Sequence, residues 1–454
     1  MPVPVAPQLA ALVEGVLGAP LPVRIRAWDG SEAGAADGPV AVLRHRRALR
    51  RLLWNPGELG LARAFVAGEL DVEGDLAEGL SRFWRLAREH GPSGVRPTRS
   101  DALAAARLAA RFGVLGPRPH PPASEARLGG GLHTRRRDRA AIAHHYDLSN
   151  EFYAFLLDPR MAYSCGYWTR PASPSYGLAD AQRDKLDLIC RKLGLRPGMR
   201  LLDVGCGWAS LLVHAAQHHG VTAVGVTLSA QQRAFGLARV RELGLDDRVE
   251  IRLQDYREID DPPFDAVASI EMGEHVGEDN YPVYARQLHR LLVPRGRLLL
   301  QQMSRGAAGT NSAPGGGAFM ERYVAPDMFM RPLGSTLDLL EAAGLEVVDV
   351  HALREHYVHT VRPWLDTLQD RRDEAVALVG EEQYRIWRLY LAGAALAFEE
   401  NRMGVHQVLM VRPDAEGRSG LPRARRDVVG VDPAADHAAA GNGSVRDVLT
   451  AAPR

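Results

Sequence analysis

Five short apolar segments recur at regular spacing in the second half of the chain, and amphipathic segments with a helical repeat separate them. They span residues 200–204, 222–227, 248–253, 264–270 and 297–303. Strands that alternate with helices in this way build a mostly parallel sheet with helices on both faces, so we predict an α/β fold. Ligands of such sheets bind beyond the carboxyl ends of the strands. The residues that follow each strand are therefore the first candidates for a site.

The distribution of helix breakers divides the chain of 454 residues into parts. Residues 116–132 are rich in proline and glycine, which is typical of a linker. They separate a small domain, residues 1–115, from the main domain, residues 133–411. Residues 412–454 contain no aromatic side chain, and we predict a disordered tail there because such a segment buries too little apolar surface to fold.

The small N-terminal domain contains both kinds of regular structure. Residues 22–27 and 41–45 have the pattern of strands, whereas residues 46–55 and 76–90 have that of helices. We predict a small α+β domain that serves lipid or membrane docking or dimerisation, so a homodimer is one expected state.

The overall composition excludes several classes of protein. Apolar residues make up 46% and charged residues 24%, which is ordinary for a globular protein, and the net charge of +1 gives no general affinity for nucleic acids. Only three cysteines occur, and we expect no metal site and a reducing compartment. Because no signal peptide and no apolar run of membrane-spanning length is evident, we predict a cytoplasmic protein.

A glycine-rich turn follows the first predicted strand. Asp203, Gly205, Cys206, Gly207 and Trp208 occur there in the sequence DVGCGW, and glycines let the backbone approach a ligand closely. A dinucleotide fingerprint would need a third glycine where serine stands at position 210, and an acid at the end of the second strand, where Thr-Leu-Ser stands instead. A nicotinamide cofactor is therefore disfavoured.

The turn resembles the S-adenosylmethionine pocket of class I (Rossmann-like) methyltransferases when it is taken together with two later segments, VTLSAQQ (226–232) and LQDYRE (253–258). The resemblance implies that the methionine part lies at residues 205–208, the ribose near Thr227, Ser229 and Gln232, and the adenine near Asp255 and Tyr256. Tyr163 and Ser164 complete the predicted pocket. Asp203 either contacts the cofactor or orders the loop. The sequence DPPF at residues 261–264 resembles a motif of nucleic-acid methyltransferases, but it precedes a strand instead of following one, so no nucleic acid is expected.

Four longer segments resemble the cyclopropane-fatty-acyl-phospholipid synthase family. They are HHYDLSNEFYAFLLDPRMAYSCGYW (144–168), SIEMGEHVG (269–277), EHYVHTVRPW (355–364) and YLAGAALAFEENRMGVHQ (390–407). Members transfer the methyl group of S-adenosylmethionine to the cis double bond of a phospholipid acyl chain. This chemistry leaves a carbocation, which aromatic faces stabilise. The aromatic candidates, which could equally pack a core, are Phe152, Tyr153, Tyr163, Tyr167 and Trp168.

The base that removes the final proton is the open question. The resemblance implies a bicarbonate ion held by the backbone of Cys165 and by Glu274 and Tyr357. Where the family commonly has histidine and isoleucine, this chain has Gln301 and a methionine, and glutamine offers no positive charge. The bicarbonate is therefore doubtful, and a protein carboxylate, with Glu274 as the first choice, is the alternative base. The further catalytic candidates are Glu271, Glu151 and His275.

Two products are compatible with the resemblance. Direct proton loss closes a cyclopropane ring, whereas a prior hydride shift yields an exocyclic methylene. Gln301 and residues 323–332 resemble the actinobacterial methyl-branching (tuberculostearic-type) members, so we predict a 10-methylene product, which a separate reductase would saturate. Methylation of a small soluble acceptor and non-catalytic lipid carriage are more distant alternatives.

A cluster of arginines predicts peripheral contact with a membrane that contains anionic phospholipid. Its eight members stand against only two acidic residues between positions 107 and 139. They are Arg107, Arg111, Arg118, Arg127, Arg135, Arg136, Arg137 and Arg139.

Overall fold

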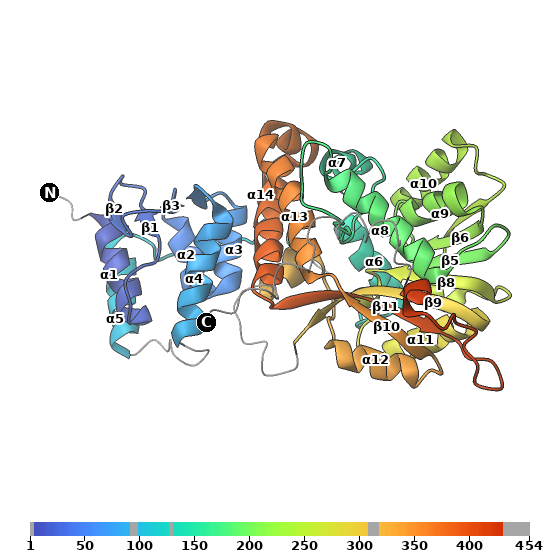
Figure 1. Ribbon diagram of the computed structural model, residues 1–454. Helices are drawn as coiled ribbons and strands as arrows, with labels where there is room; N and C mark the ends of the chain where they lie inside the picture. The colour runs from blue at the N-terminus through green and yellow to red at the C-terminus, as the bar shows by residue number, and fades with distance from the viewer. Residues whose placement is uncertain (1–3, 91–98, 127–129, 147, 307–316, 430–454) are drawn as a thin grey trace, which may run out of the picture.

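The computed structural model describes residues 4–90, 99–126, 130–146, 148–306 and 317–429. Two sheets organise these residues, a four-stranded one near the N-terminus and a seven-stranded one in the main domain. A helical hairpin, α13 and α14, stands between the two sheets (Figure 1).

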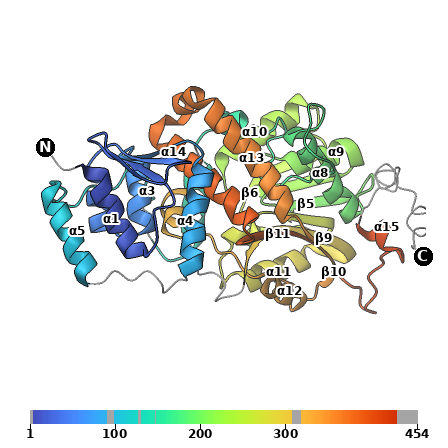
Figure 2. The same ribbon diagram turned by 60° about the vertical axis from the view of Figure 1, so that its left-hand side comes forward.

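The N-terminal unit mixes strands and helices, in agreement with the predicted α+β class. Its sheet has the order β2-β1-β3-β4, and α1 and α5 lie side by side at its far end (Figure 2). The elements are α1 (Val5–Leu17), β1 (Arg24–Arg26), β2 (Glu32–Gly34), β3 (Val40–Leu43), α2 (Arg47–Trp54), α3 (Glu58–Val66), β4 (Leu70–Glu73), α4 (Leu76–His90) and α5 (Arg99–Arg111).

The large sheet has the strand order β10-β11-β9-β8-β5-β6-β7. The five strands predicted from the sequence are all present and parallel, and β11 runs antiparallel to its neighbours β9 and β10. The last two strands, β10 and β11, are not among the strands predicted from the sequence. The bounds are β5 (Arg200–Val204), β6 (Thr222–Thr227), β7 (Val249–Leu253), β8 (Phe264–Ile270), β9 (Leu292–Arg305), β10 (Glu346–Ala352) and β11 (Met403–Val411).

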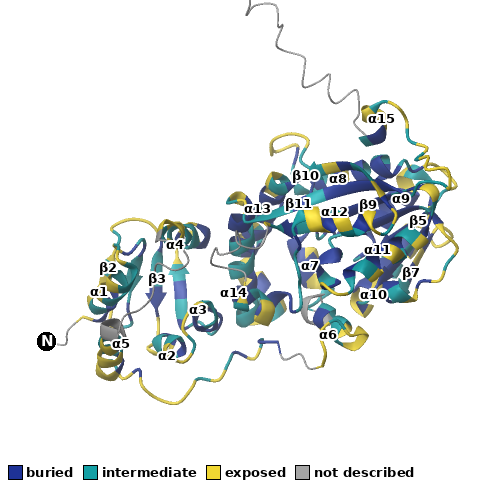
Figure 3. Cartoon of the chain, turned by 90° about the horizontal axis from the view of Figure 1, so that it is seen from below, coloured by how far each residue is buried: buried dark blue, intermediate teal, exposed yellow. Residues whose placement is uncertain are grey.

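Helices cover both faces of this sheet, and the alternation of side chains along each strand decides which face a residue joins. Leu201 packs with α8, α9 and α10, whereas the next residue, Leu202, packs with α11 and α12. Most residues of the central strands β5, β8 and β9 are buried between these layers (Figure 3). These helices are α8 (Leu178–Leu193), α9 (Ser210–His219), α10 (Ala230–Glu242), α11 (Tyr281–Arg290) and α12 (Leu333–Glu341).

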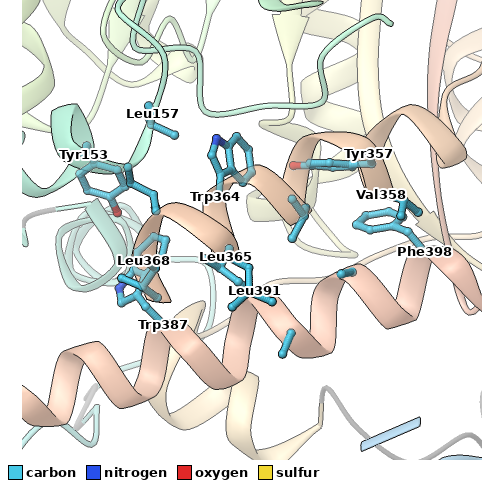
Figure 4. Close-up of a cluster of buried hydrophobic side chains, with 14 of the residues drawn as sticks. Tyr153, Leu157, Tyr357, Val358, Trp364, Leu365, Leu368, Trp387, Leu391 and Phe398 are labelled. Atoms are coloured by element: carbon cyan, nitrogen blue, oxygen red, sulfur yellow. The ribbon is translucent and has the colours of Figure 1, made fainter. Parts of the chain in front are cut away.

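The hairpin of α13 (Arg354–Asp370) and α14 (Arg372–Glu399) is inserted between β10 and β11. Aromatic and aliphatic side chains fill the space between the hairpin and α7 (Asn150–Leu156) (Figure 4). No helix among the described residues is both long and apolar enough to cross a bilayer.

The other side of α14 packs against the N-terminal unit. Arg385 forms an ion pair of 2.8 Å with Asp71, and both side chains are buried. Beside this pair, Ile386 packs against Ala62 and Val66 of α3. The hairpin is therefore shared by the two units.

The predicted linker contains no regular element among its described residues, yet it is anchored. Glu125 pairs with Arg63 at 2.6 Å, and both groups are buried. The prediction of a disordered tail from residue 412 onward is wrong for residues 412–429, where Asp414 accepts hydrogen bonds from Arg295 and α15 (Arg425–Val429) follows. Composition alone could not reveal these ion pairs. Residues 430–454 lie outside the described residues.

Candidate active site

The glycine turn after β5 is held in a shape that only glycine adopts easily. Gly205 has a φ of +88°, and a Cβ atom built there would lie 2.7 Å from the Cγ of Met272. The N–H groups of Gly205 and Cys206 both donate to the carbonyl of Val226 on β6, at 3.0 Å. The turn is thereby fixed to the sheet, and α9 begins directly after it.

A pocket opens beyond this turn, at the carboxyl ends of β5, β6 and β8. The predicted cofactor residues that line it are Tyr163, Ser164, Asp203, Gly205, Cys206, Gly207, Trp208, Thr227, Gln232, Asp255 and Tyr256. Ser229 does not line the pocket. Its hydroxyl caps α10 by accepting from the N–H of Gln232, and its own N–H donates to Thr227, so its contribution is to position these two residues.

Two buried groups give the inner end of the pocket its polarity. Burial raises the pKa of Asp203 to about 7, although the nearby Lys185 opposes this shift, and Oδ1 of Asp203 has no hydrogen-bond partner within the described part of the chain. Lys185 of α8 donates to the hydroxyl of Ser164 at 2.8 Å. An unpartnered acceptor in a pocket is what a ligand with N–H or O–H donors requires. The sequence signal for Lys185 was a charge within the apolar stripe of a helix.

Helix α6 (Arg135–Tyr146) covers the outer end of the pocket. Its Asp138 pairs with Arg257 at 2.8 Å, and Arg257 also pairs with Asp255 at 2.6 Å. The hydroxyl of Tyr256 is buried and has no partner among the described residues. The end of the pocket that the sequence analysis assigned to adenine is therefore closed by an ion-pair network and retains one unused polar group.

The carboxylate of Glu271 occupies the centre of a ring of donors. Its Oε1 accepts from the backbone N–H of Cys165 at 2.9 Å and from Nε2 of Gln301 at 2.7 Å. Its Oε2 accepts from the hydroxyl of Tyr357 at 2.6 Å. Three of the groups that the family resemblance assigned to an anion thus bind a side chain of the protein itself. Burial raises the pKa of Glu271 above its ordinary value, and these three hydrogen bonds oppose that rise because they favour the charged form of the carboxyl group.

The backbone and a second glutamine orient this carboxylate. Glu271 has a φ of +51°, a conformation that costs a non-glycine residue about 1 kcal/mol and is found mostly at functional sites. Gln407 of β11 donates to the Oε1 of Gln301 at 3.0 Å, which directs Nε2 of Gln301 toward Glu271. Gln407 escaped the sequence analysis because β11 itself was not predicted.

Glu274, the first choice for the base, lies behind the pocket instead of lining it. Its Oε1 accepts from the backbone N–H of Met303, and its Oε2 has no partner among the described residues. Burial, reinforced by the nearby charge of Glu271, raises the pKa of Glu274 to about 8. At neutral pH the protonated form of Glu274 therefore predominates.

A pH-dependent stability follows from Glu274. Because its pKa is raised in the fold, this group's contribution to stability is complete below its ordinary pKa near 4.5 and is lost as pH rises toward about 8. We expect the free energy of unfolding of Glu274→Gln, which cannot ionise, to increase relative to that of the parent protein between pH 5 and pH 8, by roughly 1 kcal/mol per pH unit, so that the difference in melting temperature grows with pH. Thermal melts of both proteins, with the exposed Glu151→Gln as control, measure this. A difference that is constant with pH would contradict the assignment.

The remaining catalytic candidates differ in burial and in whether they line the pocket. Glu151 is exposed in the first turn of α7 and lines no part of the pocket, so its position does not support the predicted role as a base. His275 lines the pocket, and burial lowers its pKa to about 4, so it is neutral at pH 7. Burial raises the pKa of the Cys165 thiol well above its ordinary value, which leaves its backbone N–H as the functional group.

Of the five aromatic candidates, only Tyr163 lines the pocket. Its ring lies 5.4 Å from that of Trp364 and its hydroxyl donates to Tyr390, so the hairpin of α13 and α14 closes this side. Phe152 and Tyr153 are completely buried against Trp387. Tyr167 packs on His356, and Trp168 packs on Tyr176.

The strand order, the glycine turn and the polar pocket above it define a class I S-adenosylmethionine-dependent methyltransferase. The model of the family described as mycolic acid cyclopropane synthetase matches residues 133–408. The chain belongs to this family, as its sequence motifs predicted.

Relatives with similarity over most of the chain include two named fatty acid enzymes. A probable fatty acid methyltransferase of Pseudomonas putida is 38% identical over 424 residues, covering 92% of this chain and 99% of the relative. A tuberculostearic acid methyltransferase of Mycobacterium tuberculosis is 31% identical over 410 residues, covering 86% and 88%. Among solved structures, a mycolic acid cyclopropane synthase complexed with SAH and CTAB is 32% identical, with a TM-score of 0.56, and covers 60% of this chain and 97% of that one.

Proposed function

We propose that the protein methylates the cis double bond of an unsaturated, oleoyl-type phospholipid acyl chain and forms a 10-methylene product. The observation that carries the proposal is the oriented carboxylate of Glu271 at the wall of the cofactor pocket. A carbon–carbon double bond has no proton to lose before it is methylated, so the base must act afterwards and must be held in place in a site without water. A buried carboxylate with three donors meets this need.

S-adenosylmethionine, when bound, supplies an electrophilic methyl group. With it bound, the electron pair of the double bond would form the new carbon–carbon bond while the bond from that methyl group to sulfur breaks, so that S-adenosylhomocysteine would be left and the positive charge would pass to the acyl chain. A hydride shift first moves the positive charge to the carbon that carries the new methyl group. Glu271 then accepts a proton from that methyl group, and the electrons of the broken C–H bond form the exocyclic double bond. Tyr163 and the hairpin aromatics exclude water, and the ring face of Tyr163 stabilises the charge by about 0.5–2 kcal/mol.

The predicted methylene product is supported by the relative named tuberculostearic acid methyltransferase. The cyclopropane ring is the second candidate, and the family's name favours it. Both products gain one CH2 unit and therefore have equal mass. Gas chromatography with mass spectrometry of fatty acids from expressing cells separates the isomers, and mild hydrogenation saturates the methylene before the ring. Purified protein that methylates no unsaturated phospholipid in vesicles, while methylating soluble acceptors, would contradict the proposal.

An exposed apolar group on the N-terminal unit supports peripheral docking to a membrane. Leu53, Trp54 and Leu115 are 45%, 51% and 59% exposed. Trp54 lies beside the segment that contains Leu115, because its Nε1 donates to the carbonyl of Gly116, and Leu53 precedes Trp54 on α2. We call these three side chains the docking patch. Exposed arginines of the predicted cluster lie nearby in sequence.

The arginine cluster itself is only partly available to lipids. Arg137 is bound to the buried carboxylate of Asp327 at 2.6 Å and is therefore less available to lipids, whereas Arg135, which pairs with Glu258 at 2.7 Å, stays largely exposed. Arg127 lies outside the described residues.

We expect Trp54→Ser to weaken binding to anionic vesicles about tenfold, because an exposed large apolar side chain contributes about 1.5–3 kcal/mol when it becomes buried. Leu253→Ser, which removes a side chain of similar exposure (49%) from the far edge of the sheet, is the control and should bind as the parent does. Vesicle co-sedimentation measures both variants. An equal loss of vesicle binding in the two variants would contradict a role of the docking patch in membrane binding.

A further inference from the structure

A cluster of metal-binding side chains lies between α8 and α9, which are neighbours in both ribbon views (Figures 1 and 2). Asp187 and Cys190 are one turn apart on α8, and His214 and His219 come from α9. The Sγ of Cys190 and one ring nitrogen of each histidine all lie within 4.8 Å of one another. Oδ1 of Asp187 lies 3.9 Å from Nε2 of His214 and 3.7 Å from Nε2 of His219.

The two histidines present unused atoms to the centre of this cluster. Nε2 of His214 and Nε2 of His219 are both buried and have no hydrogen-bond partner within the described part of the chain. His214 is only 6% exposed. A buried polar atom without a partner costs about 1–3 kcal/mol, and two such atoms beside the same carboxylate oxygen indicate room for a ligand that all three would bind.

The spacing matches the edges of a coordination tetrahedron. Bonds of about 2.0–2.3 Å to a central zinc ion place neighbouring ligand atoms about 3.3–3.8 Å apart. The distance from Asp187 to His219, 3.7 Å, falls within this range, and the distance from Asp187 to His214, 3.9 Å, lies just above it. The thiol and the two rings, whose ligand atoms lie within 4.8 Å of one another, would have to close by up to about 1 Å. One sulfur, two imidazole nitrogens and one carboxylate oxygen form a donor set that suits zinc.

The cluster is separate from the methyltransferase pocket, because none of its four residues lines that pocket. Both helices nevertheless reach the pocket, α8 through Lys185 and α9 through Ser210 at its first turn. A metal ion between the helices would join the two elements that flank the cofactor turn.

We propose that Asp187, Cys190, His214 and His219 form a structural zinc site that clamps α8 to α9. This inference is independent of the acyl substrate. It also departs from the sequence analysis, which expected no metal because three scattered cysteines gave no recognisable spacing. The four ligands come together only through the packing of two helices.

The test uses the full-length protein purified without a histidine tag. After loading with zinc sulfate and dialysis, elemental analysis should find one zinc ion per chain, and cobalt loading should give a thiolate-to-cobalt charge-transfer band together with intense visible bands of tetrahedral cobalt. Zinc should also raise the melting temperature, and a chelator should reverse the rise.

Three variants decide which residues hold the metal. His214→Ala should lose the zinc, and Cys190→Ser should lose the charge-transfer band even where it retains some cobalt. His218→Ala is the matched control, because His218 is exposed on the same helix beside His214. This variant should bind as much zinc as the parent protein does. Circular dichroism checks that each variant is folded, and Asp187→Asn replaces His214→Ala if the latter does not fold. The proposal would be overturned if the parent protein bound no zinc. It would also be overturned if Cys190→Ser, His214→Ala or Asp187→Asn bound as much zinc as the parent, and the cluster would then be an ordinary aspartate–histidine ion pair.

Discussion

Replacing Glu271 by glutamine is expected to reduce turnover by about 10²–10⁴-fold, the usual contribution of a positioned base. Glutamine cannot accept the proton, and its amide would face the N–H donors of Cys165 and Gln301. Binding of S-adenosylmethionine should change little, so the loss should lie in kcat. The exposed Glu151→Gln is the control and should keep parental turnover. Normal turnover of Glu271→Gln would exclude this residue as the base.

A second variant distinguishes a base from a structural carboxylate. Glu271→Gly relieves the positive φ and leaves the donors of Cys165, Gln301 and Tyr357 without an acceptor. We expect this variant to be inactive in buffer free of carbon dioxide and to regain activity when bicarbonate or formate is added. The parent protein should not respond to either anion. Failure of both anions in a folded variant, together with a bicarbonate-dependent parent, would restore the original expectation of a bound bicarbonate.

Gly205→Ala is expected to abolish most of the affinity for the cofactor. The left-handed backbone costs alanine about 1–2 kcal/mol, and the close approach to Met272 adds about 1–3 kcal/mol of overpacking. The turn can relieve this strain only by moving away from its bonds to Val226, which displaces the floor of the pocket. Calorimetric titration with S-adenosylhomocysteine should show at least about a tenfold weaker Kd.

Gly198 provides a closely matched control at the other end of the same strand. Its φ of +87° is nearly that of Gly205, but a Cβ atom there would meet nothing within 4 Å. Gly198→Ala should therefore show the conformational cost as a lower melting temperature and keep the cofactor affinity. Equal loss of affinity in the two variants would mean that backbone strain, and not the contact with Met272, disturbs the pocket.

The parallel strands and the cofactor turn could be predicted because both depend on local pattern. Apolar runs of five to seven residues and the glycines at positions 205 and 207 carry their meaning within a few neighbours. The antiparallel strand β11 follows the hairpin of α13 and α14, and its pairing with β9 spans about a hundred residues. No local signal records such a pairing. The link from Gln407 to Gln301 and Glu271 was invisible for this reason.

The choice between Glu271 and Glu274 illustrates the limit for the site. The two acids stand three residues apart after one strand, and sequence alone gives either of them the same chance of facing the pocket. The positive φ of Glu271 and the short 3-10 helix of residues 273–275 turn one carboxylate toward the donors and the other toward the backbone of Met303. Such a reversal depends on three-dimensional packing.

The sharing of α14 has a practical meaning for anyone who wishes to shorten this enzyme. The matched 60% of the chain covers 97% of the mycolic acid cyclopropane synthase, so that relative has little room for an N-terminal unit of this size. In this protein, truncation at the linker would remove Asp71, the ion-pair partner of Arg385, and would expose Ile386 to solvent. An uncovered apolar helix face invites aggregation. The N-terminal unit therefore covers part of the hydrophobic core of the catalytic domain, and we do not expect the catalytic domain to be stable without it.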